Sequence, residues 1–90
     1  MNKNELIAKV AEETSLTKAD CQRVIEATLE TTKKAVKKGE EVRLVGFGTF
    51  VRSKRAARKG RNPQTGKEIQ IKAHHVPRFR AGKEFKDFVR

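Results

Sequence analysis

The side chains best suited to chemistry in this chain are cationic, and they gather in the stretch RAARKGRNPQTGKE, from Arg55 to Glu68. This stretch holds five Lys or Arg, one acid, one proline, two glycines and no large apolar side chain. Guanidinium and ammonium groups attract phosphates and pair with them. Because such a segment cannot join a hydrophobic core, we expect it to leave the folded body and bind a polyanion.

The distribution of charge along the chain supports this interpretation. The 90 residues have a net charge of +11; residues 1–48 hold nine Lys or Arg against eight Asp or Glu, whereas residues 49–90 hold thirteen against three. A basic surface of this strength favours nucleic acid as the partner. Lysines that only kept the protein soluble would not need to be concentrated in one half of the chain.

Catalysis and metal binding find little support. His74 and His75 are adjacent, so on a strand they point to opposite faces and cannot converge on one metal or substrate. Gly46 and Gly48 flank Phe47 without the helix start and spacing of a nucleotide-binding loop. Cys21 is the only cysteine, which excludes an internal disulfide and fits a reducing compartment. We expect no enzyme activity, no catalytic residue, no metal site and no cofactor.

The elements that must position the basic stretch begin with two helices. Asn2 and Glu5 resemble a capping box for a helix over residues 3–14, and Thr17 can cap a second helix together with Asp20. Apolar and small side chains then recur at helical spacing until Gly39, a typical stop. This stripe comprises Cys21, Val24, Ile25, Thr28, Leu29, Thr32 and Val36. Residues 1–39 are predicted to form a helical hairpin.

Strands follow the hairpin. Val42, Leu44 and residues 47–51 have the β-branched and aromatic character of strands. Beyond Val51, alternation places cations on both faces of the chain, so neither face can join a core. One face has Arg52, Lys54 and Arg58, and the other has Arg55, Lys59 and Arg61.

This strand is predicted to turn back and form a ribbon. Residues 62–66 have turn chemistry, and residues 69–72 start a returning strand whose isoleucines could pack near Ala56 and Ala57. The result is a two-stranded basic arm over about residues 52–75. Its curved, slim form suits the minor groove of DNA better than the grooves of A-form RNA, although RNA stays an alternative partner. Pro63 at the tip either inserts between base pairs or only shapes the turn.

All five aromatic residues are phenylalanines. Stacking on nucleic-acid bases is one interpretation, but their apolar neighbours favour packing in a core or a dimer interface. With only 36% hydrophobic against 37% charged residues, a second copy of the chain would help to complete a thin core. A last helix over residues 83–90 is expected to turn Phe85, Phe88 and Val89 inward.

Three segments carry a resemblance to a known family. VGFGTF at 45–50, RAARKGRNPQTG at 55–66 and VPRFRAGKEFK at 76–86 resemble the bacterial histone-like HU family and its relative integration host factor, and the similarity covers the whole chain. The resemblance implies an α+β fold and a single domain over residues 1–90, in an intertwined homodimer. Each chain would contribute helices to the body, a three-stranded antiparallel sheet over residues 40–80 that extends into the arm, and a short C-terminal helix over residues 81–90.

The same resemblance, combined with the charge pattern, assigns residues to roles. Pro63 would be the intercalating residue of the arm. DNA contacts of the arm are expected from Arg52, Lys54, Arg55, Arg58, Lys59, Arg61, Asn62, Pro63, Gln64, Lys67, Lys72 and His74. Contacts of the body are expected from Lys3, Arg80, Lys83 and Lys86, and the dimer core from Leu29, Leu44, Phe47, Phe50 and Phe79.

The function implied is that of an architectural protein which bends, kinks, compacts and stabilises double-stranded DNA with little sequence preference. Nicked, gapped or bent DNA should bind more tightly because part of the deformation cost is already met. We expect a cytoplasmic protein associated with the nucleoid and no membrane partner; a heterodimer with a paralogue is an alternative to the homodimer. The chain departs from the family at Arg52 and Ser53, where an apolar residue and arginine are common, and at Lys72 and Ala81, where proline is usual.

Overall fold

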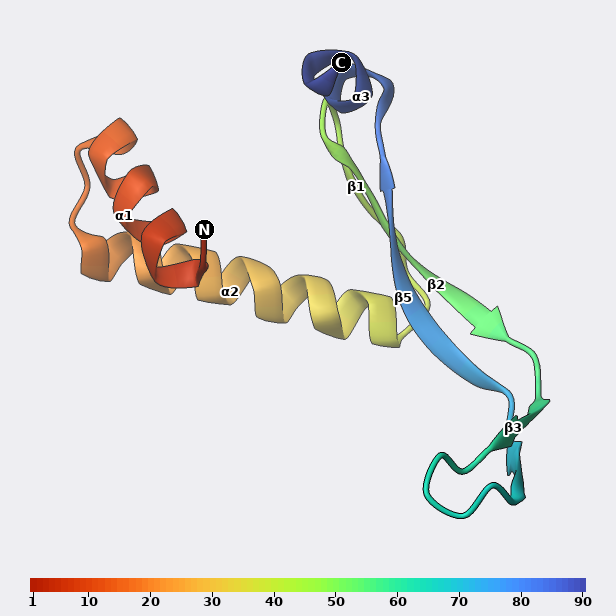
Figure 1. The fold of residues 1–90 in the computed structure, drawn as a ribbon. Helices are drawn as coiled ribbons and strands as arrows, with labels where there is room; N and C mark the ends of the chain where they lie inside the picture. Colours follow the sequence, from red (N-terminus) through yellow and green to blue (C-terminus); the bar gives the residue numbers. More distant parts are fainter. The chain divides into compact units, whose positions relative to one another are not determined.

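The computed structural model describes residues 1–90 and confirms the predicted α+β class (Figure 1). The elements in chain order are α1 (Lys3–Thr14), α2 (Lys18–Lys37), β1 (Val42–Leu44), β2 (Gly48–Arg55), β3 (Arg58–Arg61), β4 (Glu68–Ile71), β5 (His74–Ala81) and α3 (Lys83–Val89). They divide into two compact units, Met1–Lys34 and Ala35–Arg90, with the boundary inside α2. The single domain over residues 1–90 stays a prediction. None of the helices is long and apolar enough to span a membrane.

The first unit consists of α1 and most of α2, and both predicted helix starts are confirmed. The backbone N–H of Glu5 donates to Asn2 Oδ1 at 2.9 Å, and that of Asp20 donates to Thr17 Oγ1 at 3.1 Å. Each side-chain oxygen thus satisfies an N–H that has no partner inside its helix. Ile7, Ala11 and Cys21 form the buried cluster between the two helices, with Val10 and Ile25 packed against it.

The apolar stripe of α2 is buried at its ends and open in its middle. Cys21 and Val36 are buried, whereas Val24 is 61% and Leu29 48% exposed in the single chain. Large apolar side chains left in water are unfavourable by about 25 cal/mol per Å² of apolar surface. The open part of the stripe is therefore surface that a second copy of the chain could cover.

The second unit is built on a three-stranded antiparallel sheet with the strand order β1-β2-β5. Val42 pairs with Phe50 at one edge, and β2 pairs with β5 from Gly48↔Ala81 to Arg55↔His74. A turn joins β1 to β2: the Phe47 N–H donates to the Leu44 carbonyl at 2.9 Å, and Gly46 has a φ of +83°, a conformation that favours glycine.

Gly48 is needed for a different reason. A Cβ at this position would lie 2.5 Å from Phe79 Cζ and 2.6 Å from the Arg80 carbonyl oxygen. The absence of a side chain lets the Phe79 ring cross the start of β2. The two glycines around Phe47 therefore serve the turn and aromatic packing, in agreement with the rejection of a nucleotide-binding loop.

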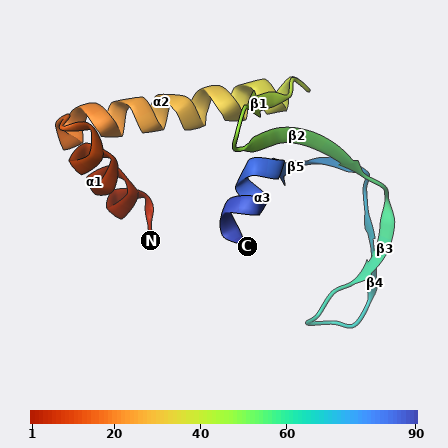
Figure 2. The ribbon, with the colours of Figure 1, turned by 90° about the horizontal axis from the view of Figure 1, so that it is seen from above.

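The arm is present, but as a second, two-stranded sheet of β3 and β4 rather than as unbroken extensions of β2 and β5 (Figure 2). Two residues interrupt each strand, Ala56 and Ala57 on one side and Lys72 and Ala73 on the other. Because the gaps are equal, pairing resumes in the same register at Arg58↔Ile71. The interruption thus adds no bulge to the ribbon.

The short helix α3 follows the sheet, and one part of its prediction was wrong. Phe85 does turn inward and stacks on Phe47 with 4.9 Å between ring centroids. Phe88 and Val89 are 88% and 69% exposed in the single chain. The helix has only seven residues, and its one inward face is occupied by Phe85.

Candidate nucleic-acid interface

The register of the sheet separates its side chains into two chemically different faces. Residues directly opposite each other in an antiparallel pair share a face. Arg78 pairs with Val51, Arg80 pairs with Thr49, and Thr49 also pairs with Arg43 across β1. Arg55, opposite His74, lies on the same face by alternation along β2. We call this the basic face of the sheet, defined by Arg43, Arg55, Arg78 and Arg80.

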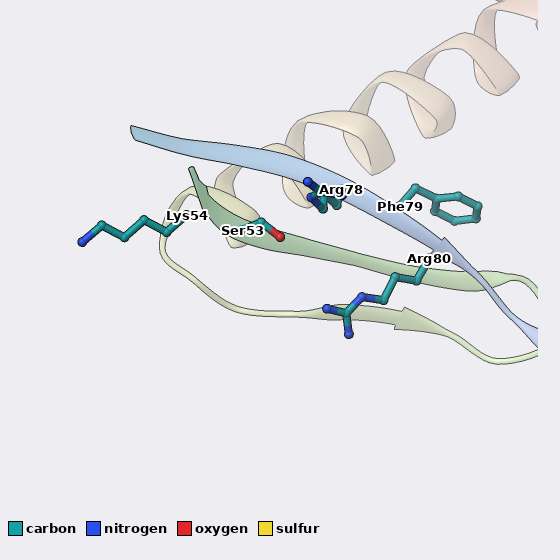
Figure 3. Close-up of a pocket in the computed structure, with 5 residues that line it drawn as sticks. All are labelled: Ser53, Lys54, Arg78, Phe79 and Arg80. Carbon is teal, nitrogen blue, oxygen red and sulfur yellow. The ribbon is translucent and has the colours of Figure 1, made fainter. Parts of the chain in front are cut away.

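A shallow hollow of about 430 Å³ lies over the β2–β5 pair. It is lined by Ser53, Lys54, Arg78, Phe79 and Arg80 (Figure 3). Figure 3 shows the Phe79 ring and the Arg80 guanidinium pointing to opposite sides of β5. Arg78, Arg80 and the Ser53 hydroxyl share one face of the sheet by register, and these side chains are of the kind that donates hydrogen bonds to a phosphate group.

The opposite face of the sheet holds Phe50 and Phe79, which cluster with Phe47 and Phe85, and toward the arm it also holds Arg52 and Lys54. Phe79 lies at the centre, with ring centroids 5.2 Å from Phe47, 4.9 Å from Phe50 and 6.2 Å from Phe85. These distances fit aromatic packing within one cluster. Packing is therefore confirmed over base stacking for these four rings. The dimer core predicted from Leu29, Leu44, Phe47, Phe50 and Phe79 stays a prediction, and Leu44, Phe47 and Phe79 are 40%, 45% and 39% exposed.

The arm presents its cations to solvent. Arg58, Lys59 and Arg61 on β3 are exposed, as are Lys54 and Arg55 at the end of β2. Gly60 on β3 pairs directly with Ile69 on β4, and a Cβ on Gly60 would lie 3.0 Å from Ile71 Cδ1, whereas packing of the isoleucines near Ala56 and Ala57 stays a prediction. The small residue that accommodates the isoleucines is thus Gly60, which lets the arm stay thin.

The tip of the arm is organised by Asn62. Its Oδ1 accepts from the Gln64 N–H at 2.9 Å, its carbonyl accepts from the Gly66 N–H at 2.8 Å, and its own N–H donates to the Lys67 carbonyl at 2.9 Å. Gly66 has a φ of +70°. These bonds close the loop around Pro63, which is exposed at the end of the arm.

Ion pairing differs between the first unit, Met1–Lys34, and the second unit, Ala35–Arg90. The three salt bridges of the structure are Lys3–Glu26, Arg23–Asp20 and Lys33–Glu30, all within residues 1–34. None of the sixteen Lys and Arg side chains in residues 35–90 lies within salt-bridge distance of a carboxylate. Their charge is therefore available to an external anion.

Two residues assigned to the arm have other contacts. The Arg52 Nη1 donates to the Lys37 carbonyl at 3.0 Å, at the end of α2, and the assignment of Arg52 to the DNA contacts of the arm stays a prediction. The sequence pattern assigns Arg52 to a face of its strand but does not show what its long side chain reaches. His74 Nδ1 lies 3.0 Å from the Lys72 carbonyl, where the chain crosses from β4 to β5. Lys67 and Lys72 are exposed.

The residues assigned to the body fall in different places. Arg80 lies on the basic face of the sheet, and Lys83 and Lys86 are exposed on α3. Lys3 is in the helical unit, where its Nζ lies 3.4 Å from Glu26 Oε1. A hydrogen bond from Gln22, together with Lys3, lowers the pKa of Glu26 below its ordinary value of 4.5.

Sequence reasoning missed Arg43 and Arg78. The signal was present for Arg78, since Arg78 and Arg80 are two residues apart on one strand and must share a face. Arg43 could be placed only from the β1–β2 register. No group of three or more His, Cys, Asp or Glu side chains is placed to hold a metal ion.

Comparison with known proteins agrees with this geometry. The family model described as "Bacterial DNA-binding protein" matches residues 1–90. The chain is 56% identical over 89 residues to the DNA-binding protein HU of Streptococcus mutans, covering 99% of this chain and 98% of the relative. It is 53% identical over 90 residues to that of Staphylococcus aureus, with full coverage of both. The chain therefore belongs to the bacterial DNA-binding protein family.

Solved structures point to the HU branch of this family. A chain of the Anabaena HU–DNA cocrystal structure matches with a TM-score of 0.94 and 49% identity, covering 99% of this chain and 97% of that one. HU from Thermotoga maritima matches with a TM-score of 0.73 and 33% identity over the full length of both chains. The resemblance predicted from three sequence segments is confirmed over the whole chain.

Proposed function

We propose that this protein is an architectural DNA-binding protein that acts in the bacterial nucleoid without enzymatic activity. The observation that supports this most directly is the set of unpaired cations in residues 35–90, because their fields add over one face and one arm. Each phosphate that they neutralise releases condensed counterions. The basic face and the exposed side of the arm would bind successive phosphates along the borders of one groove, with Lys83 and Lys86 extending the contact.

The arms of a homodimer would embrace the duplex through its minor groove. Support for the second copy comes from the apolar surface left open in a single chain: the middle of the α2 stripe and the partly exposed Leu44, Phe47 and Phe79. A dimer that buries this surface would unfold at a temperature that rises with protein concentration. Sedimentation equilibrium across a hundredfold range of concentration tests it directly; a monomer throughout would contradict this part of the proposal.

Pro63 is the proposed wedge. It is exposed at the tip, it lacks an N–H to satisfy, and the bonds made by Asn62 hold the loop around it without its help. Insertion between base pairs costs a few kcal/mol per unstacked step, offset by the extra DNA surface that reaches the sheet. DNA that is already nicked or gapped would avoid part of this cost.

The proposal is tested by fluorescence anisotropy with a straight duplex and the same duplex carrying a nick, at three salt concentrations. We expect the nicked probe to bind about tenfold more tightly, equivalent to about 1.4 kcal/mol, and both affinities to fall steeply with salt. Pro63→Ala should reduce the preference for the nick while leaving the salt dependence unchanged. Equal affinities for both probes would contradict bending, and stronger competition by duplex RNA than by duplex DNA would indicate an RNA-binding protein instead.

A further inference from the structure

At the C-terminal end of α2, the motif that ends the helix provides no hydrogen-bond donor for the backbone carbonyl of Lys37. Gly39, with a φ of +88°, forms a Schellman motif: its N–H donates to the Val36 carbonyl at 3.0 Å, and the Glu40 N–H donates to the Ala35 carbonyl at 3.0 Å. The last carbonyls of a helix have no partner within the helix. The motif supplies donors for the carbonyls of Ala35 and Val36 but none for the carbonyl of Lys37.

Arg52 supplies the missing donor. Its Nη1 lies 3.0 Å from the Lys37 carbonyl oxygen. The same guanidinium lies against Gly39, where a Cβ would be 3.0 Å from Arg52 Nη2 and 3.4 Å from Cζ. A cation here also faces the negative end of the helix dipole. Arg52 thus contacts the end of α2 at two places, Gly39 and Lys37. Lys37 lies fifteen residues before Arg52 in the chain.

These contacts give Arg52 a different task from the other arginines near the arm. Lys54, Arg55, Arg58 and Arg61 have no intramolecular hydrogen bond from their side chains in the structure, whereas the Arg52 guanidinium is already engaged. The bond to Lys37 uses one of the five N–H donors of the guanidinium and holds the group toward the end of α2 rather than toward the arm. Arg52 lies within β2 (Gly48–Arg55), three residues before this strand ends at the arm.

We propose that Arg52 is a positioning residue that fastens the base of the arm to the last turn of α2 and does not contact DNA. The consequence is that the first strand of the arm leaves from a fixed point on the second unit, while the arm beyond Ala56 and Ala57 is free to follow the groove. The part of this inference that concerns DNA rests on the proposed function; the part that concerns Arg52 and α2 does not.

The test uses the full chain and the variant Arg52→Met, which keeps an unbranched apolar stem and removes the guanidinium. We expect the melting temperature to fall by about 4–8 °C, the shift that roughly corresponds to the net contribution of one typical hydrogen bond in a domain of this size. Hydrogen exchange of the Gly39 and Glu40 amides should accelerate, and the carbonyl ¹³C signal of Lys37 should move. An unchanged Lys37 signal would overturn the proposed contact whatever the DNA result.

Salt dependence of DNA binding separates a positioning role from a phosphate contact. The slope of log K against log salt concentration should be the same for Arg52→Met and the native chain, whereas the matched variant Arg58→Met should lower its magnitude by about 0.9, the loss of one phosphate contact. Arg52→Lys should restore part of the melting temperature, because an ammonium can still donate to the Lys37 carbonyl. A slope reduced by about 0.9 in Arg52→Met, with an unchanged melting temperature, would show that Arg52 binds phosphate and would overturn the inference. Absence of DNA binding by the native chain would contradict the proposed function but leave the exchange and ¹³C results to decide the role of Arg52.

Discussion

The two compact units of this chain differ most in how they use charge. Residues 1–34 hold six Lys or Arg against six Asp or Glu, and they contain every salt bridge of the structure. Residues 35–90 hold sixteen against five and contain none. Salt bridges in the first unit form within α2 and between α1 and α2, whereas the cations of the second unit are left for a ligand. Lysine and arginine occur in both units. The position of a cation in the fold, rather than its residue type, therefore decides whether it is free to bind a ligand.

Removing charge from the arm should have the largest effect and gives the sharpest test of this difference. Arg58→Gln, Lys59→Gln and Arg61→Gln together should reduce the salt slope of DNA binding by about 2.7, if each binds one phosphate. The matched control replaces Lys9, Lys18 and Lys34, which are exposed in the first unit and form no salt bridge. Anisotropy titrations at three salt concentrations measure both slopes. Equal losses from the two triple variants would mean that only net charge matters and that the difference between the units has no functional meaning.

Crowding at Gly48 gives the next largest effect, on stability rather than binding. Gly48→Ala places a Cβ 2.5 Å from Phe79 Cζ and 2.6 Å from a backbone oxygen, so the sheet or the aromatic cluster must shift. We expect the free energy of unfolding to fall by about 1–3 kcal/mol, measured by urea denaturation. Gly66→Ala is the control, because its φ of +70° is strained but no atom lies within 4 Å of the new Cβ. Gly48 has no positive φ, so a Gly48→Ala variant as stable as the native chain would contradict the crowding, whatever the strain at Gly66 costs.

Two phenylalanines on the same short helix test the extent of the core. Phe85 stacks on Phe47, whereas Phe88 is 88% exposed in the single chain. Phe85→Ala should lower the free energy of unfolding by about 1–3 kcal/mol, less than full burial would give because the ring is only partly covered. Phe88→Ala should change it by less than about 0.5 kcal/mol. A large loss from Phe88→Ala, visible in the same denaturation experiment, would place that ring in an interface between copies of the chain.

Local patterns predicted the helices, the turn residues and the basic arm because each depends on neighbours close in sequence. Asn2 and Thr17 cap their helices through bonds to residues three positions away, and the alternation of β5 is sufficient to place Arg78 beside Arg80. Contacts set by tertiary geometry were not predicted. Nothing in the local sequence indicates that Arg52 reaches Lys37 or that Phe88 has no partner within the chain. Long side chains and short helices leave several partners within reach, and only the fold selects one.

The smallest predicted effect is a change with pH in the stability that Glu26 gives to the first unit. Glu26 accepts hydrogen bonds from Gln22 at 3.2 Å and from Lys3 at 3.4 Å, and these lower its pKa below the ordinary value of 4.5. A carboxyl whose pKa is lowered on folding adds stability above its unfolded pKa and loses that contribution as pH falls through the folded pKa. The native chain should therefore be slightly more stable than Glu26→Gln at neutral pH, and the difference should vanish in acid, below the lowered pKa. Melting temperatures of both proteins between about pH 7 and pH 2 measure this, with Glu12→Gln, which removes an exposed carboxylate outside any salt bridge, as the control. A difference that persisted undiminished at the acid end would mean that Glu26 stabilises the helices through its shape rather than its charge, and the balance of ion pairs in the first unit would then contribute nothing to its stability.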